Sequence, residues 1–233
     1  NGSETLTVNP VDNSIYDAGG NEASTSVLPG GNALSFDGVD DDVIINNNIS
    51  AFSEDYTINF FFKAGQNDYG NAKGLIGKAK IQSSMDGWQI FITTDNGGEL
   101  LFNIGSKYLR GPGKDSFSND KWHYVTIVYS SSNDMGEFYF DGTRNQDLRD
   151  FGSYNDLDSN IDIFIGRDRS STSTSFFNGK IDEFTIWNKA LSKDEIVALY
   201  NSDVALDTRN NSGSYQSADN VKGYWKFDEG SGT

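Results

Sequence analysis

Hydrophobic and polar residues alternate along most of the chain, from Leu34 to Trp187. Ile58, Phe60 and Phe62, for example, fall on one face of an extended segment, and the residues between them fall on the other. Similar segments lie at residues 43–45, 88–92, 100–104, 123–129, 137–140, 161–165 and 182–187. Clusters of Gly, Asn and Asp, which favour turns, separate many of these segments. The pattern predicts an all-β fold in which two antiparallel sheets pack as a sandwich.

One segment follows helical spacing instead. Ser192 stands three residues before Glu195, which is the arrangement of a capping box at the start of a helix. Ile196, Leu199 and Tyr200 then recur at the spacing of one helical face. We therefore expect one short helix near the C-terminus, packed against the sandwich.

Composition excludes several classes of function. The formal net charge of -16 opposes binding to the phosphates of nucleic acid or to an anionic membrane surface. The chain has no cysteine, so disulfides, thiolate zinc sites and thiol nucleophiles are absent. No apolar run reaches the roughly 18 residues of a membrane-spanning helix. We therefore expect neither nucleic acid as a partner nor insertion into a membrane.

Five segments together resemble a known family. They occur, in this order, at Ala33–Asp41, Lys121–Val125, Phe138–Gly142, Ile165–Arg167 and Phe177–Ser192. They are similar to the laminin-G-like domains of bacteria and their phages, within the concanavalin A-like lectin/glucanase superfamily. The resemblance implies a two-sheet antiparallel jelly roll, which we take as a single domain over residues 1–233. It also implies an extracellular recognition module on a cell surface or virion surface.

The end of the chain allows two interpretations. Residues 221–233 are strand-like and contain Trp225 and Phe227. In the resembled family a strand of this kind opens the domain, so the segment either starts a tandem repeat or closes this domain's own sheet. We favour the closing strand, because the two aromatic side chains need an apolar surface on which to pack.

The resemblance implies a structural calcium ion. The motif positions correspond here to Asp17, Asn21, Asp37 and Asp182. Carboxylate and amide oxygens are the ligands that Ca²⁺ prefers, and an ion held in this way would tie the beginning of the fold to its end. A second calcium ion would need another acidic cluster, and Asp134, Asp141 and Asp168 are the candidates.

Sugar-binding relatives use either the concave face of a sheet or the loops at the rim of the sandwich. In such sites an aromatic ring stacks on the sugar, and amides or carboxylates bind its hydroxyl groups. The candidate aromatic residues here are Tyr69, Trp88, Tyr108 and Tyr154. The expected partner is a glycan or a cell-surface polysaccharide, with other copies of the protein as a further possibility.

Catalysis is not expected. The glucanases of this superfamily carry paired acidic residues in the order Glu-x-Asp-x-x-Glu, and this spacing does not occur. Asp182 and Glu183 are neighbours, so they point to opposite faces of a strand. The single histidine, His123, lies in an alternating segment that predicts a core position. The alternatives to a lectin are a structural module of a virion, fibre or surface layer and, less favoured, a glycoside hydrolase.

Overall fold

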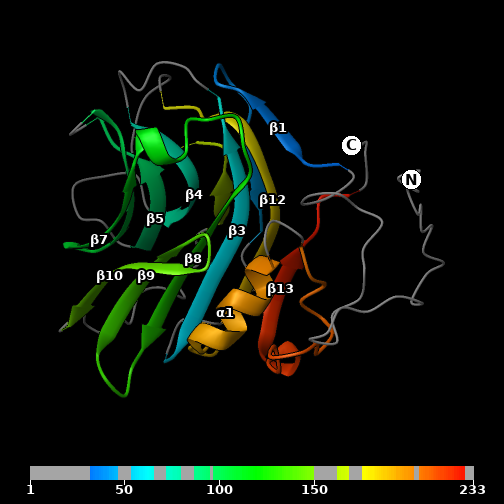
Figure 1. Ribbon diagram of the computed structural model, residues 1–233. Helices are drawn as coiled ribbons and strands as arrows, with labels where there is room; N and C mark the ends of the chain where they lie inside the picture. Colours follow the sequence, from blue (N-terminus) through cyan, green and yellow to red (C-terminus); the bar gives the residue numbers. More distant parts are fainter. Residues whose placement is uncertain are drawn as a thin grey trace, which may run out of the picture.

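The alternating segments form two antiparallel sheets that lie face to face (Figure 1). The computed structural model describes residues 32–46, 54–65, 72–79, 87–94, 97–149, 162–167, 175–201 and 205–228. One sheet contains, in spatial order, β1 (Leu34–Asp37), β12 (Asn178–Trp187), β3 (Tyr56–Ala64), β8 (His123–Ser130), β9 (Met135–Phe140) and β10 (Thr143–Arg149). A seventh strand, β13 (Val221–Trp225), also pairs with β12.

The second sheet has six strands. In spatial order they are β2 (Val43–Ile45), β11 (Ile163–Ile165), β4 (Lys73–Ala79), β5 (Gly87–Ile92), β6 (Glu99–Ile104) and β7 (Lys107–Gly113). The predicted all-β sandwich with one short α-helix is confirmed. No helix in the described parts of the chain is long and apolar enough to cross a membrane.

The main core lies between the two sheets. Ile58, Phe60 and Phe62 of β3 are fully buried there, as the alternation predicts, and Ile90 and Phe102 meet them from the second sheet. Each fully buried aromatic or aliphatic side chain stabilises the fold by roughly 1.5–3 kcal/mol. The hydrophobic faces of the strands therefore hold the two sheets together.

A second hydrophobic cluster covers the outer face of the seven-stranded sheet. Helix α1 (Lys193–Tyr200) lies across this face near β13 (Figure 1). Ile196 and Leu199 of α1 pack with Trp187 of β12. The predicted capping box is present, because the Ser192 N–H donates to Glu195 Oε2 at 2.9 Å and the Glu195 N–H donates to Ser192 Oγ at 3.3 Å. The helix thus anchors a second layer on the sandwich.

The last strand shares one edge of β12 with β1. Strand β1 pairs with the first part of β12, up to Ile181, and β13 pairs with its last part, from Phe184. The Trp225 ring stacks on the Phe184 ring, with centroids 4.9 Å apart and planes 16° apart. This pairing agrees with the interpretation that the segment closes the domain's own sheet. Asp182 and Glu183 lie at the junction, where β12 also has a register shift.

Candidate ligand and metal sites

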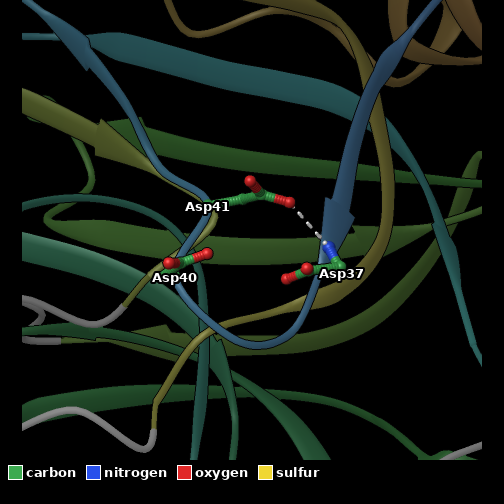
Figure 2. A group of neighbouring side chains, drawn as sticks. All are labelled: Asp37, Asp40 and Asp41. Atoms are coloured by element: carbon green, nitrogen blue, oxygen red, sulfur yellow. Dashed lines mark hydrogen bonds between the residues drawn. The ribbon is translucent and has the colours of Figure 1, made fainter.

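Three carboxylates surround the turn that follows β1. Figure 2 shows Asp37, Asp40 and Asp41, which each place a carboxylate oxygen within 4.8 Å of the others. The Asp37 N–H donates to Asp41 Oδ2 at 2.9 Å, and the Val39 N–H donates to Asp37 Oδ1 at 2.7 Å. These bonds satisfy backbone donors of the turn, which is an ordinary role for aspartate. The cluster is therefore explained by the turn itself.

Asp182 has a different environment, because it is completely buried. Its Oδ1 accepts the Glu183 N–H at 3.0 Å, whereas its Oδ2 has no hydrogen-bond partner among the described residues. Burial, reinforced by the nearby Glu183 carboxylate, raises the pKa of Asp182 to about 8. A buried carboxylate oxygen without a partner is costly, so this position favours a neutralising group.

Further charged groups gather at the same junction. Burial raises the pKa of Glu183 to about 7, although the Tyr224 hydroxyl donates a hydrogen bond to its carboxylate. Lys226 Nζ lies 2.5 Å from Asp228 Oδ2, while Asp228 Oδ1 is buried without a partner in the described structure. Carboxylates from β12 and from the segment after β13 thus interact with one another electrostatically, with Lys226 as a nearby cation.

The structure does not bring Asp37 and Asp182 together. Asp37 pairs with Asn178, and Asp182 stands four positions farther along β12. At about 3.3 Å per residue the two backbone positions are roughly 13 Å apart along the strand. The register thus places the two residues at different positions along β12. The calcium prediction stays a prediction, and its other two residues, Asp17 and Asn21, lie outside the described residues.

Trp88 is a core residue, contrary to its prediction as a ligand contact. Its side chain is fully buried between the sheets and packs near Phe102, with ring centroids 6.3 Å apart. The alternation along β5 turns Trp88 inward and Gln89 outward. The ligand-contact prediction was wrong because Trp88 lies on the face of β5 that packs into the core. Tyr69 and Tyr154 lie outside the described residues.

Tyr108 is exposed on the outer face of the six-stranded sheet, near its β7 edge. Strand pairing aligns Tyr108 with Asn103 of β6, and Asn103 with Gln89 of β5. The tyrosine keeps 41% of its surface exposed, whereas the two amides beneath it are almost covered. Gln89, Asn103 and Tyr108 are therefore neighbours across three adjacent strands, and only the tyrosine is exposed.

Arg110 lies two residues beyond Tyr108 on the same face. Its Nη1 lies 2.5 Å from Glu99 Oε2, and about half of its side chain is exposed. The backbone of Arg110 is held by β10, because Asn145 Nδ2 donates to its carbonyl oxygen at 2.8 Å. We refer to Glu99, Asn103, Tyr108 and Arg110 as the β7 patch. The patch combines an aromatic ring, an amide and a guanidinium that an ion pair orients.

A cleft of about 490 Å³ opens between α1 and the turn joining β9 to β10. We call it the α1 cleft. It is lined by residues 141–143 of the turn, by Asp194, Val197, Ala198, Tyr200 and Asn201 of the helix and its C-terminal cap, and by Gly213 and Ser214. No local sequence pattern indicated this cleft, because residues 141–143 line it together with residues from the range 194–214, which are distant in the chain. The sequence predicted only the helix on this side, from its capping box and its spacing of apolar residues.

His123 supports the turn at this cleft from within the sheet. The histidine is 6% exposed and stacks on Phe140, with centroids 4.9 Å apart. Its Nδ1 lies 2.8 Å from Asp141 Oδ2, and its Nε2 lies 3.0 Å from Asn119 Oδ1. Asp141 Oδ1 also accepts the Tyr124 N–H at 2.8 Å. The predicted core position of His123 is confirmed, and its hydrogen bond orients the Asp141 carboxylate.

A family model described as the concanavalin A-like lectin/glucanases superfamily matches residues 37–197. No curated protein sequence matches the chain significantly. Among solved structures, the CBM40 of the Ruminococcus gnavus IT-sialidase is similar, with a TM-score of 0.56 and 13% identity over 72% of this chain and 96% of that one. The same module has also been solved bound to α2,3-sialyllactose.

Other similar structures differ in size. A SAP-like pentraxin from Limulus polyphemus has a TM-score of 0.54 and 13% identity, over 83% of this chain and 90% of its own. A candidate carbohydrate-binding protein from Bacteroides ovatus has a TM-score of 0.56 and 14% identity, and the match covers 85% of this chain. The chain spans only 52% of that longer protein. At these identities the likeness shows the fold.

Proposed function

The chain belongs to the concanavalin A-like lectin/glucanases superfamily, and from this premise we propose that it is a non-catalytic carbohydrate-binding module. The observation that carries the proposal is the β7 patch, in which the exposed Tyr108 shares one face of β7 with Arg110 and pairs in register with Asn103. The CBM40 that shares the fold has been solved with sialyllactose, which supports a glycan as the class of ligand.

Tyr108 and Arg110 are the members of the β7 patch whose exposed side chains can contact a sugar. The Tyr108 ring offers an apolar face on which the C–H groups of a pyranose can pack. Arg110 supplies N–H donors, and its contact with Glu99 fixes the direction in which they point. An aromatic surface combined with a few oriented polar groups is typical of small-ligand sites. Because Arg110 is cationic, the patch can accept sugars that carry a carboxylate.

Binding to defined sugars tests the proposal. The protein is titrated calorimetrically with the best ligands from a glycan array that includes neutral and sialylated oligosaccharides. Tyr108→Ala removes the ring and should weaken binding about tenfold, or about 1.4 kcal/mol, whereas Tyr108→Phe should keep most of the affinity. Val39→Ala alters an exposed residue of the β1 turn and serves as the control. Absence of any bound glycan would refute the function.

We also propose that calcium stabilises the module. Supporting this, Asp182 Oδ2 and Asp228 Oδ1 are buried oxygens with no hydrogen-bond partner in the described parts of the chain. Oxygen-rich, negatively charged surroundings suit Ca²⁺, which would neutralise the buried carboxylate when bound. In this proposal Asp182 of the predicted set is a candidate ligand, and Asp228 joins it.

The proposed place of action is outside the cell, on a cell or virion surface. Glycans and polysaccharides are presented there, and the acidic surface implied by a net charge of -16 keeps the protein soluble and away from anionic polymers. The expected partner is a glycan, and other copies of the same protein are a further candidate partner. Immunolabelling of intact and permeabilised cells would test the location.

A further inference from the structure

Three neighbouring side chains of α1, Val197, Ala198 and Tyr200, form the more apolar part of the lining, which we call the floor of the α1 cleft. Val197 lies on the exposed side of α1 and keeps 46% of its surface exposed. Ala198 and Tyr200 line the cleft beside it. The Tyr200 ring is held by stacking on Tyr124, with centroids 6.1 Å apart and planes 24° apart. An exposed valine beside a fixed aromatic ring gives a small surface on which the apolar face of a sugar can pack.

Gly142 keeps the opposite wall close to this floor. The residue has a φ of +69°, which favours glycine, and a Cβ there would lie 3.0 Å from Cδ1 of Tyr200. Any larger residue would push the turn away from the ring or fill the space between them. The turn and the helix are therefore in close contact at this part of the cleft lining.

Polar groups surround the apolar floor. The Asp141 carboxylate is oriented by His123 and by the Tyr124 N–H, and its side chain remains 27% exposed. Each carboxylate oxygen accepts more than one hydrogen bond, so Asp141 can still accept from a hydroxyl group. Asp194 lies exposed in the first turn of α1, and Asn201 and Ser214 add an amide and a hydroxyl. These groups match the hydroxyl groups of a sugar.

The charge of the α1 cleft limits the class of sugar. Its described lining includes the carboxylates of Asp141 and Asp194 and no Lys or Arg side chain. An anionic ligand would be repelled by both carboxylates without a compensating cation. The β7 patch differs in this respect, because Arg110 lies within it. The two surfaces therefore differ in the charge of the ligand that they accept.

We propose that the α1 cleft is a second carbohydrate subsite, which binds a neutral, hydroxyl-rich sugar residue and rejects sialylated sugars. This inference rests on the proposed function, because it assumes that the module recognises glycans. It gives a binding role to exposed residues of α1, such as Val197, that do not contribute to packing of the helix on the sheet.

The test compares lactose with 3′-sialyllactose, which differ by one sialic acid, together with a panel of neutral glucose and mannose oligosaccharides. Val197→Glu places a charged side chain on the cleft floor. Lys193→Glu adds the same side chain to the same helix outside the cleft lining and is the matched control. Both positions are exposed, so both variants should fold, which circular dichroism and the Tm verify.

The expected result is that Val197→Glu weakens binding of a neutral oligosaccharide at least tenfold and leaves 3′-sialyllactose binding unchanged. Lys193→Glu should leave both unchanged. The inference is overturned if Val197→Glu and Lys193→Glu bind neutral sugars equally, or if the wild type binds only the sialylated probe. If the wild type binds only 3′-sialyllactose, the proposed carbohydrate-binding function is still supported, although the second subsite is not. If no sugar of either kind binds, the proposed function fails as well.

Discussion

Burial of Asp182 affects the free energy of unfolding, because it raises the pKa of the carboxyl group. Its carboxylate is fully buried, lies near Glu183 and has one oxygen without a partner among the described residues. A buried charge is tolerated only when it is neutralised, by a proton or by a cation. The stability of the fold therefore depends on the protonation of Asp182 and, under the calcium proposal, on the bound ion.

Asp182→Asn should change stability in opposite directions with and without calcium. In a chelator the amide removes the free-energy cost of either protonating or burying this carboxylate, so the Tm should rise. In millimolar calcium the wild type should gain several degrees from the ion, and the variant should gain much less. Differential scanning calorimetry under both conditions measures the effect. Asp40→Asn, in the exposed β1 turn, is the control. Equal calcium responses in the wild type and the Asp182 variant would contradict the assignment.

Glu195 should make the stability of the fold decrease as the pH falls, because its pKa is lowered in the folded protein. Burial would raise its pKa, but hydrogen bonds from Ser217 and Ser192, with help from Lys189, outweigh burial and lower the pKa. A lowered carboxylate pKa stabilises the fold above the unfolded pKa of about 4.5, and this contribution is lost as the pH falls through the folded pKa.

The Glu195→Gln variant isolates that contribution. Glutamine can still cap the helix, but it has no charge to lose and cannot pair with Lys189. Near pH 7 the variant should be less stable than the wild type by about 1 kcal/mol. The difference should shrink between pH 5 and pH 3, as measured by urea unfolding. A constant difference over this range would show that the charge of Glu195 contributes nothing.

At the scale of elements, β13 decides how one edge of the seven-stranded sheet is completed. It pairs with the part of β12 that β1 leaves unpaired, and Trp225 stacks on Phe184 and packs, partly buried, against the main core. Gly223 makes room for this ring, because a Cβ there would lie 2.3 Å from the indole. The strand is therefore an integral part of the sheet to which it pairs.

Trp225→Ala should destabilise the protein by about 2 kcal/mol, which is less than for a fully buried tryptophan because the ring is only partly covered. Lys222→Ala changes an exposed residue of the same strand and should cost less than about 0.5 kcal/mol. Urea unfolding followed by circular dichroism compares the two variants. If both variants unfold at the same urea concentration, packing of β13 adds little stability.

At the scale of the whole molecule, net charge opposes folding. The formal charge of -16 concentrates in the folded state, where carboxylates repel one another more strongly than in the expanded chain. Raising potassium chloride from about 0.02 M to about 0.5 M screens this repulsion. We expect the Tm to rise by a few degrees in the presence of a chelator, which excludes effects of contaminating calcium. A falling Tm would mean that favourable ion pairs outweigh the repulsion.

The sequence determined the parts of the fold that depend on local pattern. Alternation fixed the inward face of β3, with Phe60 and Phe62 in the core, because successive side chains of a strand must point to opposite sides. The capping residues of α1 were evident for a similar reason, since Ser192 and Glu195 interact within one turn of helix. Such features need only neighbouring residues.

Tertiary structure decided the rest. Alternation places Trp88 on the apolar face of β5, but only tertiary packing decides that its side chain is completely covered and has no surface left for a ligand. The separation of Asp37 from Asp182 follows from the register between β1 and β12, which are more than 140 residues apart in the chain. The α1 cleft arises where residues 141–143 meet residues from the range 194–214. Contacts between residues that are distant in the chain depend on how the sheets and the helix pack. A local sequence pattern therefore cannot predict them.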